Sequence, residues 1–160
     1  MTAIALIQDA ALTRVAILGS RPDLVFLVVV GWAFMRGSVE GAVWAFIGGL
    51  LLDVFSGGPF GSMTLALLLV AVFVGRQWGR ELGSVILQLV LLTLVSCFAY
   101  HALLLLTLSG TGHVVDWGYS LAQVAAPSAF LNALLAPFVY WPLAWLDRST
   151  RPRGLTLNGA

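Results

Sequence analysis

The fold is decided by one stretch of the chain, Gly48-Gly49-Leu50-Leu51-Leu52-Asp53-Val54-Phe55-Ser56-Gly57-Gly58-Pro59-Phe60-Gly61. This stretch ends one apolar run with a carboxylate, turns through glycines and a proline, and opens a second apolar run. An aspartate at the end of an apolar run is costly unless a hydrogen-bond donor or a partner uses its charge. We expect the rest of the chain to form membrane helices around this turn.

The composition predicts a polytopic helical membrane protein, which is an all-α fold. Of the 160 residues, 60% are hydrophobic and 9% are charged, whereas a soluble domain carries about 25% charged residues. One soluble core could not bury so much apolar surface, and helices satisfy their own backbone groups in lipid. At about 20 residues a span, the length allows at most about six helices in a single membrane domain.

Charge and cysteine content exclude several classes of function. The net charge of +1 leaves no basic surface for nucleic acid. A single cysteine, Cys97, rules out a disulfide framework, and two histidines in different segments, His101 and His113, do not make a metal site. The glycine run after Asp53 lacks the lysine of a phosphate-binding loop, and no catalytic set of side chains is present. We therefore expect a non-enzymatic protein without a cofactor or a metal.

Apolar runs and the polar breaks between them predict six helices and a tail. The predicted helices cover residues 3–19, 22–35, 39–55, 62–75, 84–108 and 119–146, and a polar cytoplasmic tail covers 147–160. Gln8, Asp9 and Arg14 interrupt the first run, so it is either a membrane span or an interfacial segment. The second alternative would leave five spans.

Local signals predict how some of these helices begin or bend. Pro22 suits a helix start, and Asp23 suits a first turn, where the helix dipole favours a carboxylate. Ser62 is a suitable N-cap for the helix over 62–75. Pro127 predicts a kink near the start of the last helix, because proline lacks the backbone N–H.

The arginines predict the orientation of the chain in the membrane. With the C-terminal tail in the cytoplasm, Arg36, Arg76 and Arg80 also fall on the cytoplasmic side. The loops over 56–61 and 109–118, which contain no arginine, then fall outside. Because cytoplasmic loops carry an excess of basic residues, we expect a cytoplasmic C-terminus, and a cytoplasmic N-terminus if the first segment spans.

A row of small residues marks one face of the helix over 39–55. Gly41, Ala45 and Gly49 recur every four residues, and Asp53 continues the row. Small residues at this spacing allow another helix to approach closely. We expect this face to dock the transmembrane helix of a partner. The turn that shapes the outer end of the face contributes Gly57, Pro59 and Gly61.

Two roles are open for Asp53. The carboxylate could fix the turn by accepting hydrogen bonds from glycine N–H groups, or it could contact a partner or ligand directly. The C-terminal end of a helix is an unfavourable place for a negative charge, because the helix dipole is negative there. This cost indicates that the carboxylate has a specific use.

The remaining polar residues of the apolar runs are predicted to be structural. His101 is expected to be neutral and hydrogen-bonded to a neighbouring helix. Tryptophans such as Trp141 and Trp145 are expected to lie at the membrane interface. Interhelical hydrogen bonds are predicted for Gln88, Ser96, Gln123 and Asn132.

The first half of the chain resembles the MreD family, the small integral membrane proteins of the bacterial rod-shape system, or elongasome. The resemblance is carried by Arg21-Pro22-Asp23-Leu24, by the short second apolar run, and by the stretch from Gly48 to Gly61. Gln8 stands in the place of a recurring glutamine. The resemblance covers about residues 6–75, and the rest is similar in length, hydropathy and an arginine-bearing tail.

This resemblance implies a non-enzymatic scaffold of the bacterial inner membrane with six helices and both termini in the cytoplasm. It also implies a fold similar to the substrate-binding subunits of energy-coupling-factor transporters. The implied partner is MreC, a bitopic protein with a large extracytoplasmic domain. Through MreC, the complex would support the RodA glycosyltransferase and its penicillin-binding transpeptidase in peptidoglycan synthesis and the maintenance of cell shape.

A small-molecule-binding subunit of such a transporter is the competing interpretation. It requires an outward cavity of roughly 300 Å³ or more with polar groups in its wall. A lipid-handling enzyme is a third and weaker interpretation. The candidates for lining the cavity are Asp53, His101, His113, Trp117 and Tyr119.

Overall fold

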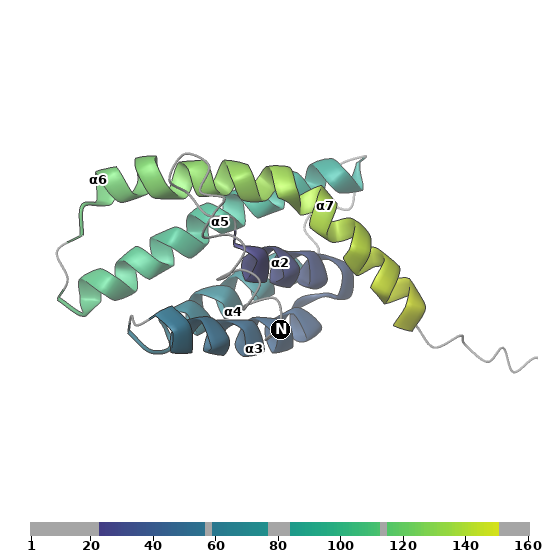
Figure 1. The fold of residues 1–160 in the computed structure, drawn as a ribbon, viewed down its shortest axis with the longest axis horizontal. Helices are drawn as coiled ribbons and strands as arrows, with labels where there is room; N and C mark the ends of the chain where they lie inside the picture. The colour runs from purple at the N-terminus through teal and green to yellow at the C-terminus, as the bar shows by residue number, and fades with distance from the viewer. Residues whose placement is uncertain (1–22, 57–58, 77–83, 113–114, 151–160) are drawn as a thin grey trace, which may run out of the picture.

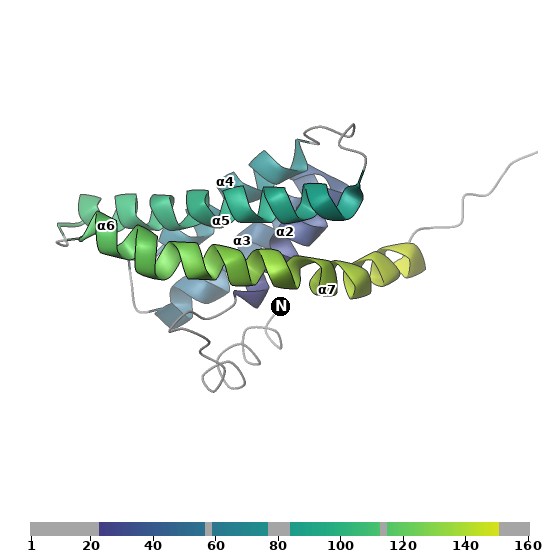
Figure 2. The same ribbon diagram turned by 90° about the horizontal axis from the view of Figure 1, so that it is seen from above.

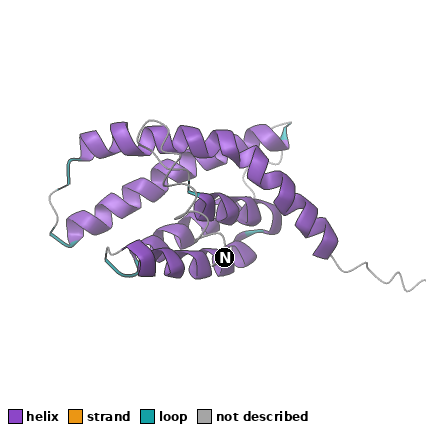
Figure 3. Cartoon of the chain, in the orientation of Figure 1, coloured by secondary structure: helices purple, strands orange, loops and turns teal. Residues whose placement is uncertain are grey.

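The computed structural model describes residues 23–56, 59–76, 84–112 and 115–150, and all regular secondary structure in these ranges is helical (Figures 1 and 3). The all-α prediction is therefore confirmed for the described residues. The predicted helix over 3–19, Pro22 and Gly57 lie outside them. The elements are α2 (Leu24–Arg36), α3 (Ser38–Ser56), α4 (Ser62–Gly75), α5 (Val85–Gly110), the short α6 (Trp117–Tyr119), the π-helical η1 (Ser120–Ala125) and α7 (Ala126–Thr150).

Three of the described helices are long and apolar enough to cross a membrane. They are α3, α5 and the continuous helical segment from Trp117 to Thr150. The other two, α2 and α4, have 13 and 14 residues. At 1.5 Å per residue each is about 20 Å long, which is less than the hydrocarbon thickness of about 30 Å.

The short helix α2 is the centre of the structure. It packs against α3, α4, α5 and α7, and Figure 1 shows it between the α3–α4 hairpin and the α5–α7 pair. Phe26, Val29 and Ala33 are fully buried within this core. Because protein rather than lipid surrounds most of α2, this helix does not need the length of a lipid-facing span.

The long helices α5 and α7 form the other side of the bundle. They run side by side in both views (Figures 1 and 2). The buried residues of both helices are largely small or polar, including Ser96 and Cys97 on α5 and Ser128, Ala129 and Ala133 on α7. Small side chains let two helices approach closely, which suits packing in a membrane.

The final helix is longer than predicted and is not a regular α-helix throughout. The π-helical turn from Ser120 to Ala125 lies immediately before Pro127, which cannot donate a hydrogen bond to the preceding turn. A change of helix type at the predicted kink therefore accommodates this proline. Pro137 and Pro142 lie within α7, and Figure 1 shows α7 changing direction in its C-terminal half.

The prediction of a polar tail from residue 147 was wrong for its first four residues, because α7 continues to Thr150. Asp147 is buried and forms an ion pair with Arg36 of α2. The hydroxyls of Ser149 and Thr150 donate to the carbonyls of Trp145 and Leu146 on the preceding turn. Polar side chains that are satisfied in this way allow the helix to extend.

The small-residue row of α3 packs against helices of the same chain. A Cβ atom at Gly41 would lie 2.5 Å from the Cβ of Ala33 on α2, and one at Gly49 would collide with the Cα of Thr64 on α4. Ala45 is also fully buried. The row provides close helix contact, as predicted from its spacing, but α2 and α4 already occupy the face that we expected a partner to occupy.

The two hairpin turns at one end of the bundle are also in backbone contact. Gly37, between α2 and α3, has a φ of +92°, and a Cβ atom at Gly75 of α4 would collide with Ser38. Arg36 and its partner Asp147 lie at this same end. The charged ends of α2, α4 and α7 are therefore gathered on one side of the molecule.

Substitution of Gly49 tests this packing. Because a new Cβ atom would collide with the backbone of α4, we expect Gly49→Ala to lower the free energy of unfolding by about 1–3 kcal/mol. The measurement is the apparent melting temperature of the purified protein in detergent. Gly110→Ala is the matched control, since a Cβ atom there meets open space and should leave the melting temperature unchanged or slightly raised. Equal melting temperatures would contradict the packing.

Candidate functional site

Asp53 lies at the end of α3 and caps the beginning of α4. Its Oδ1 accepts a hydrogen bond from the N–H of Met63 at 2.9 Å, and its Oδ2 accepts from the N–H of Thr64 at 3.0 Å. The hydroxyl of Thr64 donates to the same Oδ2 at 2.6 Å. Asp53 is only 3% exposed, so both carboxylate oxygens are bound inside the protein.

This geometry explains why a carboxylate is favourable at this position. Asp53 lies at the negative end of the α3 dipole, but it also lies at the positive end of the α4 dipole and binds the free N–H groups there. The structural role considered for Asp53 is therefore correct in kind and wrong in its donors. The donors are the first turn of α4 rather than turn glycines.

The turn residues bring α4 into register with Asp53. Gly61 is the N-cap residue of α4, with a φ of +92°, and makes no side-chain cap. Ser62, predicted as the cap, instead donates its hydroxyl to the carbonyl of Pro59 at 2.8 Å. The prediction for Ser62 was wrong because Asp53, ten residues before Met63, already accepts hydrogen bonds from the first-turn N–H groups.

Asp23 lies at the N-terminal end of α2 and connects this helix to α7 by a hydrogen bond. It is the N-cap residue rather than a first-turn residue, and its Oδ1 accepts from the N–H of Phe26 at 2.9 Å. The Asp23 N–H donates to Oδ1 of Asn132 on α7 at 3.0 Å. The Asn132 amide in turn donates to Sγ of Cys97 on α5 at 3.5 Å. One asparagine therefore links three helices, as predicted for Asn132.

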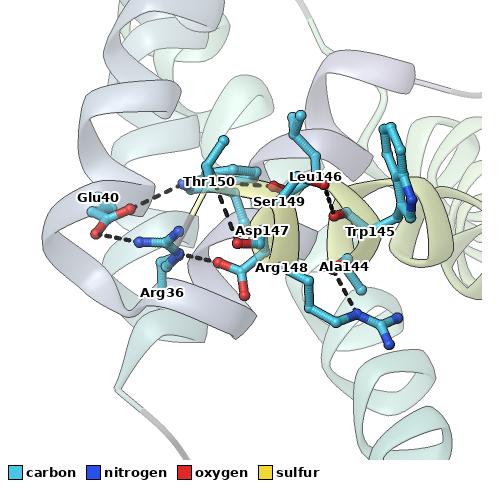
Figure 4. A network of polar contacts seen from close by, with 10 residues as sticks. Arg36, Glu40, Ala144, Trp145, Leu146, Asp147, Arg148, Ser149 and Thr150 are labelled. Carbon is cyan, nitrogen blue, oxygen red and sulfur yellow. Dashed lines mark hydrogen bonds and ion pairs between the residues drawn. The ribbon is translucent and has the colours of Figure 1, made fainter. Parts of the chain in front are cut away.

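A second polar cluster lies at the opposite end of α2 (Figure 4). Arg36 lies between Asp147 of α7 and Glu40 of α3, with ion pairs to both. Trp32 donates from Nε1 to Oε2 of Glu40 at 3.3 Å, and the Arg36 guanidinium lies 5.7 Å from the Trp32 ring centre. The cluster thus joins α2, α3 and α7.

The sequence did not indicate this cluster. Arg36 was predicted only to lie on the cytoplasmic side and Asp147 to lie in the tail, and the two are 111 positions apart. The available signal was that Arg36, Glu40 and Asp147 each border an apolar run. A charge at such a border is inexpensive only if water, lipid headgroups or an opposite charge can reach it.

Other polar residues have local roles. His101 Nδ1 lies 2.8 Å from the carbonyl of Cys97 one turn earlier on its own helix, so the predicted bond to a neighbouring helix was wrong. Ser96 is buried, and its hydroxyl has no hydrogen-bond partner among the described residues. Gln123 is exposed, while Trp141 and Trp145 are exposed on α7.

Two of the cavities on the surface are lined by described residues of α5 and α7, and both have apolar walls. One, of about 630 Å³, is formed by α7 alone, and the other, of about 220 Å³, lies between α5 and α7. Asp53, His101, Trp117 and Tyr119 line neither of them. Within the described ranges, no group of three histidine, cysteine or acidic residues is placed to hold a metal ion.

Replacement of Asp53 tests its capping role. Asp53→Ala leaves two buried N–H groups without an acceptor, and each such group costs about 1–3 kcal/mol. We expect a clear fall in the melting temperature of the purified protein in detergent. Ser62→Ala, which removes a hydroxyl from the same turn, should have a much smaller effect. If both variants were equally stable, Asp53 would not be the cap that holds α4.

Charge reversal tests the Arg36–Asp147 pair. Arg36→Asp and Asp147→Arg should each lower the melting temperature, because each leaves like charges facing one another at the end of α2. The double variant restores opposite charges and should recover part of the loss. Melting of all four proteins in detergent at low salt measures this coupling. Strictly additive effects would show that the two side chains do not interact.

A chain with these buried caps and apolar helices can be compared with known proteins. A family model described as rod shape-determining protein MreD matches residues 1–149. Searches of curated proteins and of solved structures found no match. This family match covers nearly the whole chain, including Asp53, Asp23 and the charged cluster at Arg36. The chain therefore belongs to the MreD family of rod shape-determining integral membrane proteins.

Proposed function

We propose that this chain is a non-enzymatic scaffold that binds the bitopic protein MreC in the bacterial inner membrane. Through MreC, it would support RodA and its transpeptidase in peptidoglycan synthesis. The observation that carries the proposal is the match of residues 1–149 to the family of rod shape-determining membrane proteins. The polar contacts described for Asp53 and Asp23 hold helices together, which fits a scaffold.

The docking surface for the partner helix is the outward face of α3. The row of Gly41, Ala45 and Gly49 is occupied by α2 and α4, so it is not available to another chain. The opposite side of α3 carries large exposed apolar side chains spaced three and four residues apart, the spacing at which two helices pack. These residues are Val39, Val43, Phe46, Leu50 and Val54.

The orientation proposed for the complex follows the arginine distribution. The end of the bundle that holds Arg36, Arg76 and Asp147 would face the cytoplasm. The Asp53 turn would then face outward, toward the extracytoplasmic domain of the partner. With residues 3–19 as a further span, the chain would have six spans, both termini in the cytoplasm and a fold similar to energy-coupling-factor substrate subunits.

The transporter alternative gains no support from the two cavities described above. A vitamin-sized ligand needs a few polar groups that fix its orientation. These two cavities have walls of aromatic, aliphatic and proline side chains. The family match favours the scaffold over this alternative.

Affinity purification tests the proposal. We expect the detergent-solubilised chain, expressed in its own cells, to recover a bitopic protein with a large extracytoplasmic domain, identified by mass spectrometry. A photo-crosslinker at Phe46 or Leu50 should join the two proteins, because both positions lie on the outward face of α3. Leu91 and Val95 on α5 are matched controls, since they are apolar and similarly exposed.

The possible outcomes distinguish an error in the proposed docking surface from an error in the proposed function. Recovery of the bitopic protein with crosslinks at Leu91 or Val95, but not on α3, would move the interface and keep the scaffold. Recovery of an ATPase module or a bound metabolite, without the bitopic protein, would contradict the scaffold and favour transport.

A further inference from the structure

A second outward apolar face runs along α7. Its side chains are 58–76% exposed, although all of them are large. They recur at intervals of three or four residues, so they lie on one side of the helix. We call this face the α7 stripe, and it consists of Phe130, Leu134, Phe138, Trp141 and Trp145.

The α7 stripe is hollowed rather than flat. Pro137 and Pro142, within the bent half of the helix, line the cavity of about 630 Å³ together with Phe138, Trp141 and Trp145. Pro137 also lines the smaller cavity, which continues between α5 and α7 past Leu134 and Phe130. The two cavities share Pro137 and follow one another along α7, and we call them together the apolar track. From Phe130 to Trp145 the track is about 22 Å long. This is longer than the hydrocarbon thickness of a single leaflet, which is about 15 Å.

The opposite side of the same half of α7 is fixed to α2. Tyr140 packs edge-on against Phe34, with ring centres 6.2 Å apart. Leu143 covers Gly31, where a Cβ atom would lie 2.9 Å from Cδ1 of Leu143. Asp147 completes this side through its ion pair with Arg36. These contacts hold the α7 stripe toward the outside.

Arg148 closes the α7 stripe at its C-terminal end. It follows Trp145 by three residues, so it lies on the same side of the helix. Its Nε donates to the carbonyl of Ala144 at 3.1 Å, and the side chain is exposed. Two ion pairs join described residues at this end, both made by Arg36, and Arg148 is in neither. Figure 4 shows its guanidinium directed away from Arg36.

We propose that the α7 stripe binds an anionic phospholipid. An acyl chain lies along the apolar track, and the phosphate is held by the guanidinium of Arg148. The surface presents its groups in the same order as the ligand does. The long apolar groove corresponds to the acyl chain, and the single cation after it corresponds to the phosphate. A transmembrane helix would match this cation only if it carried a carboxylate at headgroup level, whereas an anionic phospholipid always has its phosphate there. The inference does not depend on MreC binding.

Tryptophan fluorescence tests the inference on the purified full-length chain in detergent. The probes are brominated phosphatidylglycerol, which is anionic, and brominated phosphatidylcholine, which is zwitterionic. Bromine quenches nearby tryptophans, and comparison with Trp141→Phe/Trp145→Phe isolates the signal of those two residues. We expect half-maximal quenching of this signal at a several-fold lower concentration of the anionic lipid. Arg148→Gln should raise that concentration about fivefold and leave quenching by phosphatidylcholine unchanged.

Arg76→Gln is the matched control, because Arg76 is an exposed arginine at the end of a different helix, α4, and does not follow the α7 stripe. Its quenching should equal that of the unmodified protein. Equal half-maximal concentrations for the two lipids would overturn the inference, as would equal shifts in the two arginine variants. It would also be overturned if a synthetic transmembrane segment of MreC displaced the anionic lipid from Trp141 and Trp145 at stoichiometric amounts, since the face would then belong to the partner.

Discussion

The hydrogen bonds from the first turn of α4 to Asp53 are the constraint on which the structure depends. In an apolar environment, a helix N-terminus without acceptors and an unpaired carboxylate are both costly. Asp53 and the N–H groups of Met63 and Thr64 remove both costs at once. This contact fixes how α3 and α4 meet. It also sets the depth at which Gly49 lies against Thr64, so the close backbone packing follows from it.

Two polar anchors then place α2 inside the bundle. Asp23 and Asn132 hold its first residue, while the Arg36 cluster holds its last. Between them, α2 contributes an almost entirely buried apolar surface to α3, α4, α5 and α7. A helix of this length is too short to span the lipid by itself, but it can form the buried centre of the bundle. The exposed apolar faces lie instead on α3, α4, α5 and α7.

Sequence patterns predicted the features that depend on neighbours along the chain. The helical class, the close-packing character of the Gly41–Gly49 row and a disturbance at Pro127 all follow from local spacing and backbone chemistry. Errors arose where the partner is distant. Spacing shows that the row admits a helix, but not that α2 and α4 are those helices. Asp147 was assigned to a tail because its partner, Arg36, belongs to another helix.

The cap that joins α3 to α4 also constrains how the chain enters the membrane. Before the two helices meet, Asp53 is an unpaired carboxylate and α4 has open N–H groups, so neither end partitions well into lipid alone. Once paired, the carboxylate and the N–H groups satisfy one another, and α3 with α4 presents a mostly apolar exterior. Pairing before or during insertion therefore favours entry of α3 and α4 into the lipid together, as one hairpin.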